Sequence, residues 1–184
     1  MANPISAWRA DHANYARLVE CLEREAAVLE SGDRPDYELM ISILTYLTRY
    51  PDRHHHPRED EVFARLARLD PGLRSHIQLL HLQHAEIAIA GQRLLEQLEE
   101  ALNDEQLNRI ELAAAAQAYV NRYLEHIAAE DTRIIPRAAV MLTQADWEAV
   151  LRADTPGPDP LFGTNFEPGY AELRRAIAAR GFRT

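Results

Sequence analysis

Four long helix-forming segments, each with a signal for a helix start, constrain the fold of this chain more than any other feature. The signals are N-cap residues, three of them with proline at or near the first helical turn: Asn3-Pro4, Asp33-Pro35, Asp70-Pro71 and Asp104. The segments between them run for roughly thirty residues and are rich in Leu, Ala, Glu and Arg, with no alternation typical of a half-buried strand. The sequence therefore predicts an all-α protein.

Packed antiparallel helices bury residues at alternating steps of four and three along the chain. At this spacing, three segments show an apolar inward face that is interrupted almost only by histidine and glutamate. The faces are Trp8, His12, Tyr15, Val19, Leu22, Ala26 and Leu29; Ile77, His81, His84, Ala88, Gly91, Leu95, Leu98 and Leu102; and Leu112, Ala116, Tyr119, Tyr123, His126 and Glu130. Four such helices joined by short loops predict an antiparallel up-down-up-down four-helix bundle over residues 1–140.

Two features modify this simple bundle. Pro51 and Pro57 should kink or divide the second helix, because each removes a backbone donor and crowds the preceding turn. Residues 141–184 are predicted to form a C-terminal helical extension, with short helices over residues 143–152 and 168–179. We expect the extension to pack on the bundle or on the second subunit of a homodimer.

Charge and composition exclude several classes of function. The net charge of -9 leaves no basic face for a nucleic acid or an anionic membrane. Residues 1–11 lack the apolar stretch of a signal peptide, and the most apolar run, residues 112–120, is too short to span a bilayer. Cys21 is the lone cysteine, so we interpret it as a structural thiol in a reducing compartment. The sequence indicates a cytoplasmic protein that binds neither nucleic acid nor membrane.

Helical phase distinguishes the three consecutive histidines in the stretch RHHHPREDEV, residues 53–62. The apolar frame that steps back from Leu69 passes through Leu66, Val62, Glu59 and His55. The frame through His54 is mostly charged, and the frame through His56 is a weaker seam. We therefore expect His55 and Glu59, one helical turn apart, to point inward together. His54, His56 and His76 are predicted to be solvated or to support a ligand by hydrogen bonding.

The same His-x-x-x-Glu-Asp spacing recurs later in the chain, at His126 and Glu130. Each pair follows an inward histidine on the previous helix, His12 or His84, at separations of 43 and 42 residues. The chain therefore resembles two copies of one helix-pair unit. Folded antiparallel, the two units bring four imidazoles and two carboxylates into one bundle interior.

A divalent metal is the simplest compensation for so many polar groups in an apolar interior, because buried charges without partners are costly. Imidazole with carboxylate suits Fe, Mn, Co or Zn, and the absence of an inward cysteine disfavours a structural zinc site. Six or seven ligands are too many for one tetrahedral ion. They suit two ions that share the glutamates as bridges, with positions left for water or a small ligand. Tyr119 and Tyr123 are interpreted as core residues, either of which could line such a position.

Four short motifs resemble, in order, the helix motifs of the hemerythrin-like family of HHE cation-binding domains. They are Asp11-His12, HHPREDEVF from residue 55, QHAE from residue 83 and HIAAED from residue 126. The resemblance implies a four-helix bundle with two non-haem irons bridged by two carboxylates and an oxo or hydroxo group. The ligands that it implies are His12, His55, Glu59, His84, His126 and Glu130, with both glutamates bridging. His81 is either a further ligand or a hydrogen-bond donor to one.

The leading functional hypothesis is a binding protein that takes up O2, NO or a related small ligand for sensing, carriage or iron handling. The alternative is an enzyme that reduces peroxide or nitric oxide at the same centre. A third hypothesis is a structural or interaction bundle that holds metal adventitiously. No flavin, haem, sensor or kinase motif is visible, so electron supply or signalling would require a separate redox or signalling partner.

Overall fold

The computed structural model describes residues 4–103, 108–153, 159–163 and 167–180, and every regular element within them is helical. The long helices are α1 (Pro4–Glu30), α2 (Tyr37–Leu47), α3 (His56–Leu69), α4 (Arg74–Asn103) and α5 (Arg109–Ala129). Shorter helices follow: α6 (Ile135–Met141), α7 (Gln144–Ala153) and α8 (Ala171–Ala179). Single turns of 3-10 helix occur at η2 (Pro71–Leu73) and η4 (Pro168–Tyr170). The predicted all-α class is confirmed.

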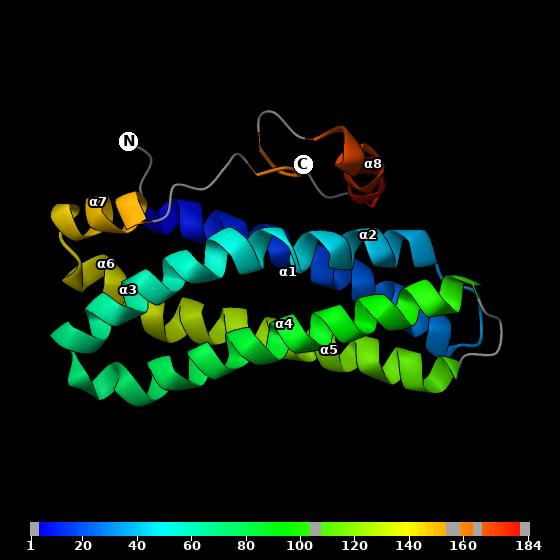
Figure 1. Cartoon of the computed structure of the whole chain (residues 1–184), viewed down its shortest axis with the longest axis horizontal. Helices are drawn as coiled ribbons and strands as arrows, with labels where there is room; N and C mark the ends of the chain where they lie inside the picture. Colours follow the sequence, from blue (N-terminus) through cyan, green and yellow to red (C-terminus); the bar gives the residue numbers. More distant parts are fainter. Residues whose placement is uncertain (1–3, 104–107, 154–158, 164–166, 181–184) are drawn as a thin grey trace.

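Four helical rods lie side by side with their connections at alternate ends (Figure 1). The first rod is α1, the second is α2 followed by α3, the third is α4, and the fourth is α5 followed by α6. Helix α1 packs on α5, while α4 packs on α2, α3 and α5. The core of the molecule therefore runs along the length of all four rods.

Both rods that carry a His-x-x-x-Glu pair contain a wide π turn next to that pair. The turn η1 (Pro51–His55) separates α2 from α3, and η3 (Glu130–Ile134) separates α5 from α6. Pro57 lies in the first turn of α3 and Pro136 in that of α6, where each lacks the donor that an ordinary helical ladder needs. The prediction that prolines divide the second helix is confirmed. π turns of this kind occur frequently at functional sites.

Most predicted inward residues are buried, including every one predicted on α1 and α5. The exceptions are Leu69 on α3 and Leu102 and His81 on α4, which are exposed, and Ala88 on α4, which is partly buried. On α4 the alternate positions of the buried strip are Leu80 and Ile87 rather than His81 and Ala88. Both strips share the residues at seven-residue spacing, from Ile77 to Leu98. The buried strip steps by three residues from Ile77 to Leu80 and from His84 to Ile87, because the neighbouring helices lie on that side of α4. The sequence of one helix does not specify on which side its neighbours lie.

The C-terminal extension packs on the bundle, with α7 against α3 and α8 against α2. Thr143 begins α7 as predicted, because its hydroxyl accepts a hydrogen bond from the Asp146 amide. The Tyr46 hydroxyl donates to Asp159 at 2.9 Å, and Arg180 donates to Glu25 at 2.9 Å. These two contacts fix α8 and the segment before it to α1 and α2.

Three other predictions concern the start of α5, Cys21 and membrane-spanning segments. Asp104, a predicted helix start, lies outside the described residues, and α5 is instead capped by Asn108, whose side chain accepts from two backbone amides. Cys21 is fully buried in the core. In the described part of the chain, no helix combines the length and the apolar character needed to cross a membrane.

Candidate metal centre

Two buried glutamates, Glu59 on α3 and Glu130 at the end of α5, lie at the middle of the bundle. Oε1 of Glu59 faces two imidazoles, at 3.2 Å from His12 Nε2 and 2.7 Å from His55 Nε2. Oε2 of Glu130 lies 3.1 Å from the same His12 nitrogen. We call His12, His55 and these two oxygens the first half of the centre.

The other oxygen of each glutamate faces a different pair of imidazoles. Oε2 of Glu59 lies 3.3 Å from His84 Nε2, while Oε1 of Glu130 lies 3.8 Å from His84 Nε2 and 3.5 Å from His126 Nε2. We call these groups the second half of the centre. Each carboxylate therefore spans both halves, which is the arrangement that a bridging ligand requires.

The donor atoms of the centre fit metal ions. Bonds from a divalent ion to imidazole or carboxylate are about 2.0–2.2 Å long, so two ligand atoms on one ion lie roughly 3 Å apart. The separations of 2.7–3.5 Å seen between most of the facing atoms match this value. The Nε2 atoms of His55, His84 and His126 and both oxygens of Glu130 have no hydrogen-bond partner among the described residues. Buried polar atoms left in this state are costly unless a cation binds them.

A fifth histidine, His56, lies in the second half of the centre. Donor atoms of His56, Glu59, His84 and His126 all lie within 4.8 Å of one another. Its ring stacks on that of His84, with the centroids 4.2 Å apart, and its side chain is buried. The expectation that His56 is solvated is therefore wrong, because its side chain is buried. We interpret it as a candidate ligand.

Helical phase assigned α3 a single inward face through His55, and the weaker frame through His56 was therefore not expected to reach the centre. Adjacent residues on a helix are about 100° apart, so His55 and His56 cannot share one seam. A helix inside a bundle has neighbours on two sides, however: His55 faces α1, where it lies near His12 and Tyr15, while His56 faces α4 and α5. One signal was available, because Asp52 precedes His56 by one helical turn and lies 3.1 Å from its Nδ1.

All five imidazoles have an oxygen near the ring nitrogen that faces away from the glutamates. The Nδ1 partners are Asp131 for His12 at 2.9 Å, Asp11 for His55 at 3.4 Å, Asp52 for His56 at 3.1 Å, Asp60 for His84 at 3.2 Å and Gln83 for His126 at 3.3 Å. Histidines that bind metals usually donate their other N–H to such an oxygen, which fixes the ring and its tautomer. This outer set of carboxylates is the clearest sign that the imidazoles are held for coordination.

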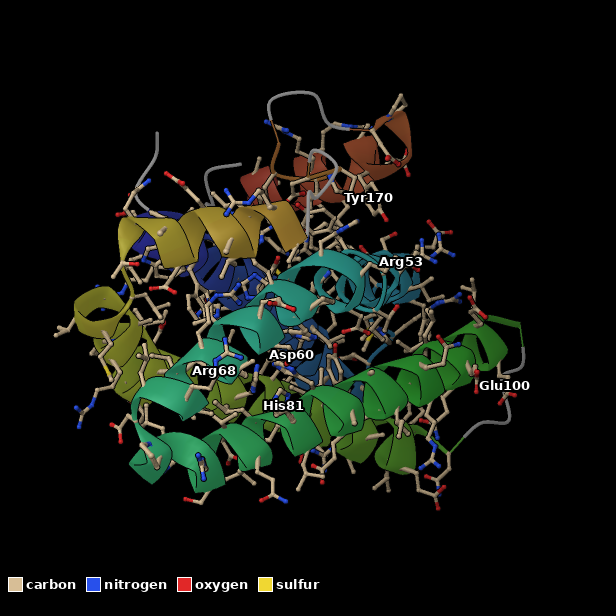
Figure 2. All side chains as sticks on the ribbon, turned by 60° about the vertical axis from the view of Figure 1, so that its left-hand side comes forward. Arg53, Asp60, Arg68, His81, Glu100 and Tyr170 are labelled. Carbon is tan, nitrogen blue, oxygen red and sulfur yellow. The ribbon has the colours of Figure 1, made fainter. Side chains whose placement is uncertain are left out.

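His81, the seventh predicted ligand, lies outside the cluster around the glutamates. Its side chain is 44% exposed, and its Nδ1 lies 2.9 Å from Asp60. Figure 2 shows the two residues close together on α3 and α4. Because Asp60 also contacts His84, His81 occupies the position of the hydrogen-bonding residue that was the alternative prediction. His54 and His76 are only partly buried.

Aromatic side chains enclose the centre. The Trp8 indole donates to Glu59 Oε1 at 2.5 Å, and the Tyr15 ring packs edge-on against His55 with the centroids 4.9 Å apart. On the opposite side, Phe63 stacks on His84. The glutamates and imidazoles of the centre are buried, so interactions among the charged groups are stronger than they would be at the surface.

In the metal-free protein, the first half of the centre retains protons. Burial opposes a charged imidazole, but the nearby carboxylates of Asp131, Glu130 and Glu59 outweigh it and raise the pKa of His12 to about 11. Burial likewise opposes ionisation of Glu59, yet His55 and His12 hold its pKa well below the usual range. An imidazolium therefore occupies the place of a cation beside an ionised carboxylate.

The three histidines of the second half differ in their protonation state. Burial disfavours the charged form of His84, but the nearby carboxylates of Asp60, Glu130 and Glu59 raise its pKa to about 11. Burial and the neighbouring His84 lower the pKa of His56 to about 3, and burial lowers that of His126 to about 4. His56 and His126 are thus neutral at pH 7, which is the form that binds a metal.

Comparison with known families agrees with this geometry. A family model described as the hemerythrin HHE cation binding domain matches residues 3–138. The chain belongs to the hemerythrin family. The resemblance that its four motifs indicated is confirmed, and cation binding follows from membership. Comparison with curated proteins finds no match.

In this hemerythrin-family centre, we expect His55→Ala and His56→Ala each to lower metal content by at least half. Each removes one imidazole from a small donor set and leaves a cavity in its place. His54→Ala should change the content by less than a tenth, because His54 is absent from all three groups of donor atoms found among the described residues. Metal per chain after purification in equal iron is the measurement. Equal losses in all three variants would contradict the assignment of His56 as a ligand.

Metal uptake by this hemerythrin-family centre at pH 7 should release roughly two to three protons, because a ligand imidazole must be neutral, His12 and His84 are protonated, and Glu59 and Asp11 raise the pKa of His55 against its burial. Since the pKa values of His12 and His84 lie near 11, the affinity should rise with pH throughout the range from 6 to 9. We expect the gain to be roughly ten- to hundredfold per pH unit. Calorimetry of Zn²⁺ binding in two buffers of different ionisation enthalpy measures the proton count, and identical heats in both would contradict it.

Proposed function

We propose that this protein is a cytoplasmic, non-haem di-iron protein that binds O2, NO or a related small ligand for sensing, carriage or iron handling. The observation that carries the proposal is the position of the two glutamates. Each directs one carboxylate oxygen toward His12 and the other toward His84. Carboxylates that face two groups of imidazoles suit a pair of ions better than a single ion.

The numbers of donor groups favour iron and an open position. The first half offers two imidazoles and two carboxylate oxygens, and the second offers three imidazoles with two oxygens. Zinc is satisfied by about four ligands, whereas imidazole and carboxylate sets with open positions are typical of non-haem iron. The first half has fewer protein donors, so we expect an external ligand to bind there.

The chain's own residues prepare the site. Carboxylates outside the centre, such as Asp131 and Asp11, orient the imidazoles, while Trp8 and Tyr15 keep water out. When bound, a reduced iron pair supplies electrons and a coordination position for a diatomic ligand. A dry, preorganised environment of this kind favours a ligand that is held without further reaction unless a partner protein delivers electrons.

An enzyme that reduces peroxide or nitric oxide is the second candidate, favoured by three buried tyrosines. The hydroxyls of Tyr15, Tyr119 and Tyr123 have no hydrogen-bond partner among the described residues. Burial raises the pKa of all three, so each keeps its proton at neutral pH. A hydroxyl held in this state is a weaker acid than a tyrosine in water, so it can hydrogen-bond to a ligand and would give up its proton only to a strongly basic oxygen of the reduced ligand.

Metal content together with an absorption spectrum tests the di-iron proposal. Protein produced with iron available should contain close to two irons per chain and, when oxidised, absorb in the near ultraviolet. One tightly bound zinc without iron would overturn it, since zinc is colourless and four ligands satisfy it.

Turnover distinguishes the two candidates. A few equivalents of peroxide or NO are added to the reduced protein together with a small-molecule reductant, and consumption is followed. A binding protein forms an adduct and stops. Many turnovers per metal pair, abolished by Glu130→Ala, would make the enzyme the better description.

A further inference from the structure

A partly enclosed cavity of about 290 Å³ lies against the first half of the metal centre. Its walls come from the start of α1, the first turns of α3, and α7. Ala7, Val62, Val150 and Leu151 contribute apolar surface, and His55 and Glu59 form the end next to the centre. The cavity therefore connects the C-terminal extension with the half of the centre that has fewer protein donors.

The cavity is larger than a diatomic ligand needs. One water molecule occupies roughly 30 Å³ in the liquid, and sites that bind small organic molecules begin near 300 Å³. A volume of about 290 Å³ is thus close to that of a site for an organic molecule of modest size. Two indole rings, Trp8 and Trp147, line it and offer flat apolar surfaces.

Arg58 gives the cavity a positive charge with unused hydrogen-bonding capacity. Its side chain lines the wall, and its buried Nε–H has no hydrogen-bond acceptor among the described residues. The two acids in the same wall, Asp11 and Glu59, already contact His55 at 3.4 Å and 2.7 Å. A buried donor without an acceptor is unfavourable, and a guanidinium binds a carboxylate through two parallel hydrogen bonds.

We propose that this cavity binds a small organic acid, with its carboxylate on Arg58 and its apolar body between Trp8 and Trp147. Helix α7, which supplies Trp147, begins at Gln144, whereas the hemerythrin match ends at residue 138. The site thus combines the family's bundle with a helix outside it. It goes beyond the proposed function, because binding in the cavity depends on the walls and on Arg58 and not on the identity of the metal.

The chain carries its own reporter for this site, since Trp8 and Trp147 are its only two tryptophans. The test uses the full-length protein loaded with zinc, and compares 3-phenylpropanoate with 3-phenylpropan-1-ol, which has the same body without the charge. Tryptophan emission and calorimetry follow binding. We expect saturable binding of the acid with at least tenfold higher affinity than the alcohol.

Three variants test the assignment. Arg58→Gln should remove at least tenfold of the affinity for the acid and leave that for the alcohol unchanged. Arg68→Gln, on the exposed end of the same helix (Figure 2), should bind both probes like the parent. Ala7→Phe, at an exposed wall position, should abolish binding of both by filling the space.

Metal content is measured in every preparation, so failure of this proposal is distinguishable from failure of the proposed di-iron centre. Normal metal content with no emission change up to 10 mM acid, roughly the weak limit for a specific small-molecule site, would overturn the cavity proposal alone. Equal affinities for acid and alcohol, or an acid affinity unaffected by Arg58→Gln, would also overturn it.

Discussion

Glu59→Gln should reduce the metal content of the protein from about two ions per chain to fewer than one, which we expect to be the largest effect of any single substitution. Glutamine keeps the size of the side chain but has one carbonyl oxygen and no charge, so it cannot bridge two cations. Both halves of the centre lose a donor at once, because Glu59 faces His55 with one oxygen and His84 with the other. Metal analysis of the purified variant measures this effect.

Matched controls lie on the same helices. Glu61→Gln on α3 and Glu125→Gln on α5 remove the same charge from exposed or partly exposed positions, so both should retain normal metal content. Glu130→Gln should behave like Glu59→Gln, since its carboxylate also spans both halves. A Glu59→Gln protein that stays helical and still holds two ions would contradict the bridging role.

Removal of the metal should lower the melting temperature by roughly 10 °C while leaving the protein helical. A ligand that binds only the folded state at a thousand times its Kd stabilises it by about 4 kcal/mol, and each kcal/mol shifts a chain of this length by about 2–4 °C. Without metal, Glu59 and Glu130 keep the imidazoliums of His12 and His84 as partial compensation, which limits the loss.

Circular dichroism before and after chelation measures both parts of this prediction. Helicity should persist because the apolar core extends far beyond the centre, for example through Leu22, Ile43 and Leu98. Restoring zinc or iron should restore the melting temperature. A chelated protein without helical signal at 20 °C would show that the metal, and not the apolar core, holds the bundle together.

The fold class and the convergence of six predicted site residues could be read from the sequence, because both depend on periodicity within single helices. His12, His55 and Glu59 share the phase of the apolar residues around them, and the second unit repeats the pattern with His84, His126 and Glu130. The structure brings all six together around the two carboxylates. Proline positions also predicted where the second rod divides, since the lost backbone donor acts locally.

Tertiary structure alone decided the features that depend on which helix lies beside which. Helical phase alone shows that His56 and His81 each lie near an inward strip of their helix. Only the packing of the neighbouring helices against α3 and α4 places His56 in the centre and leaves His81 at the surface beside Asp60. The same holds for the outer carboxylates that orient the imidazoles, and for the cavity that α7 closes over Trp8. A helix's sequence fixes the angle between its side chains, whereas the partner that each side chain meets is set by packing between segments far apart in the chain.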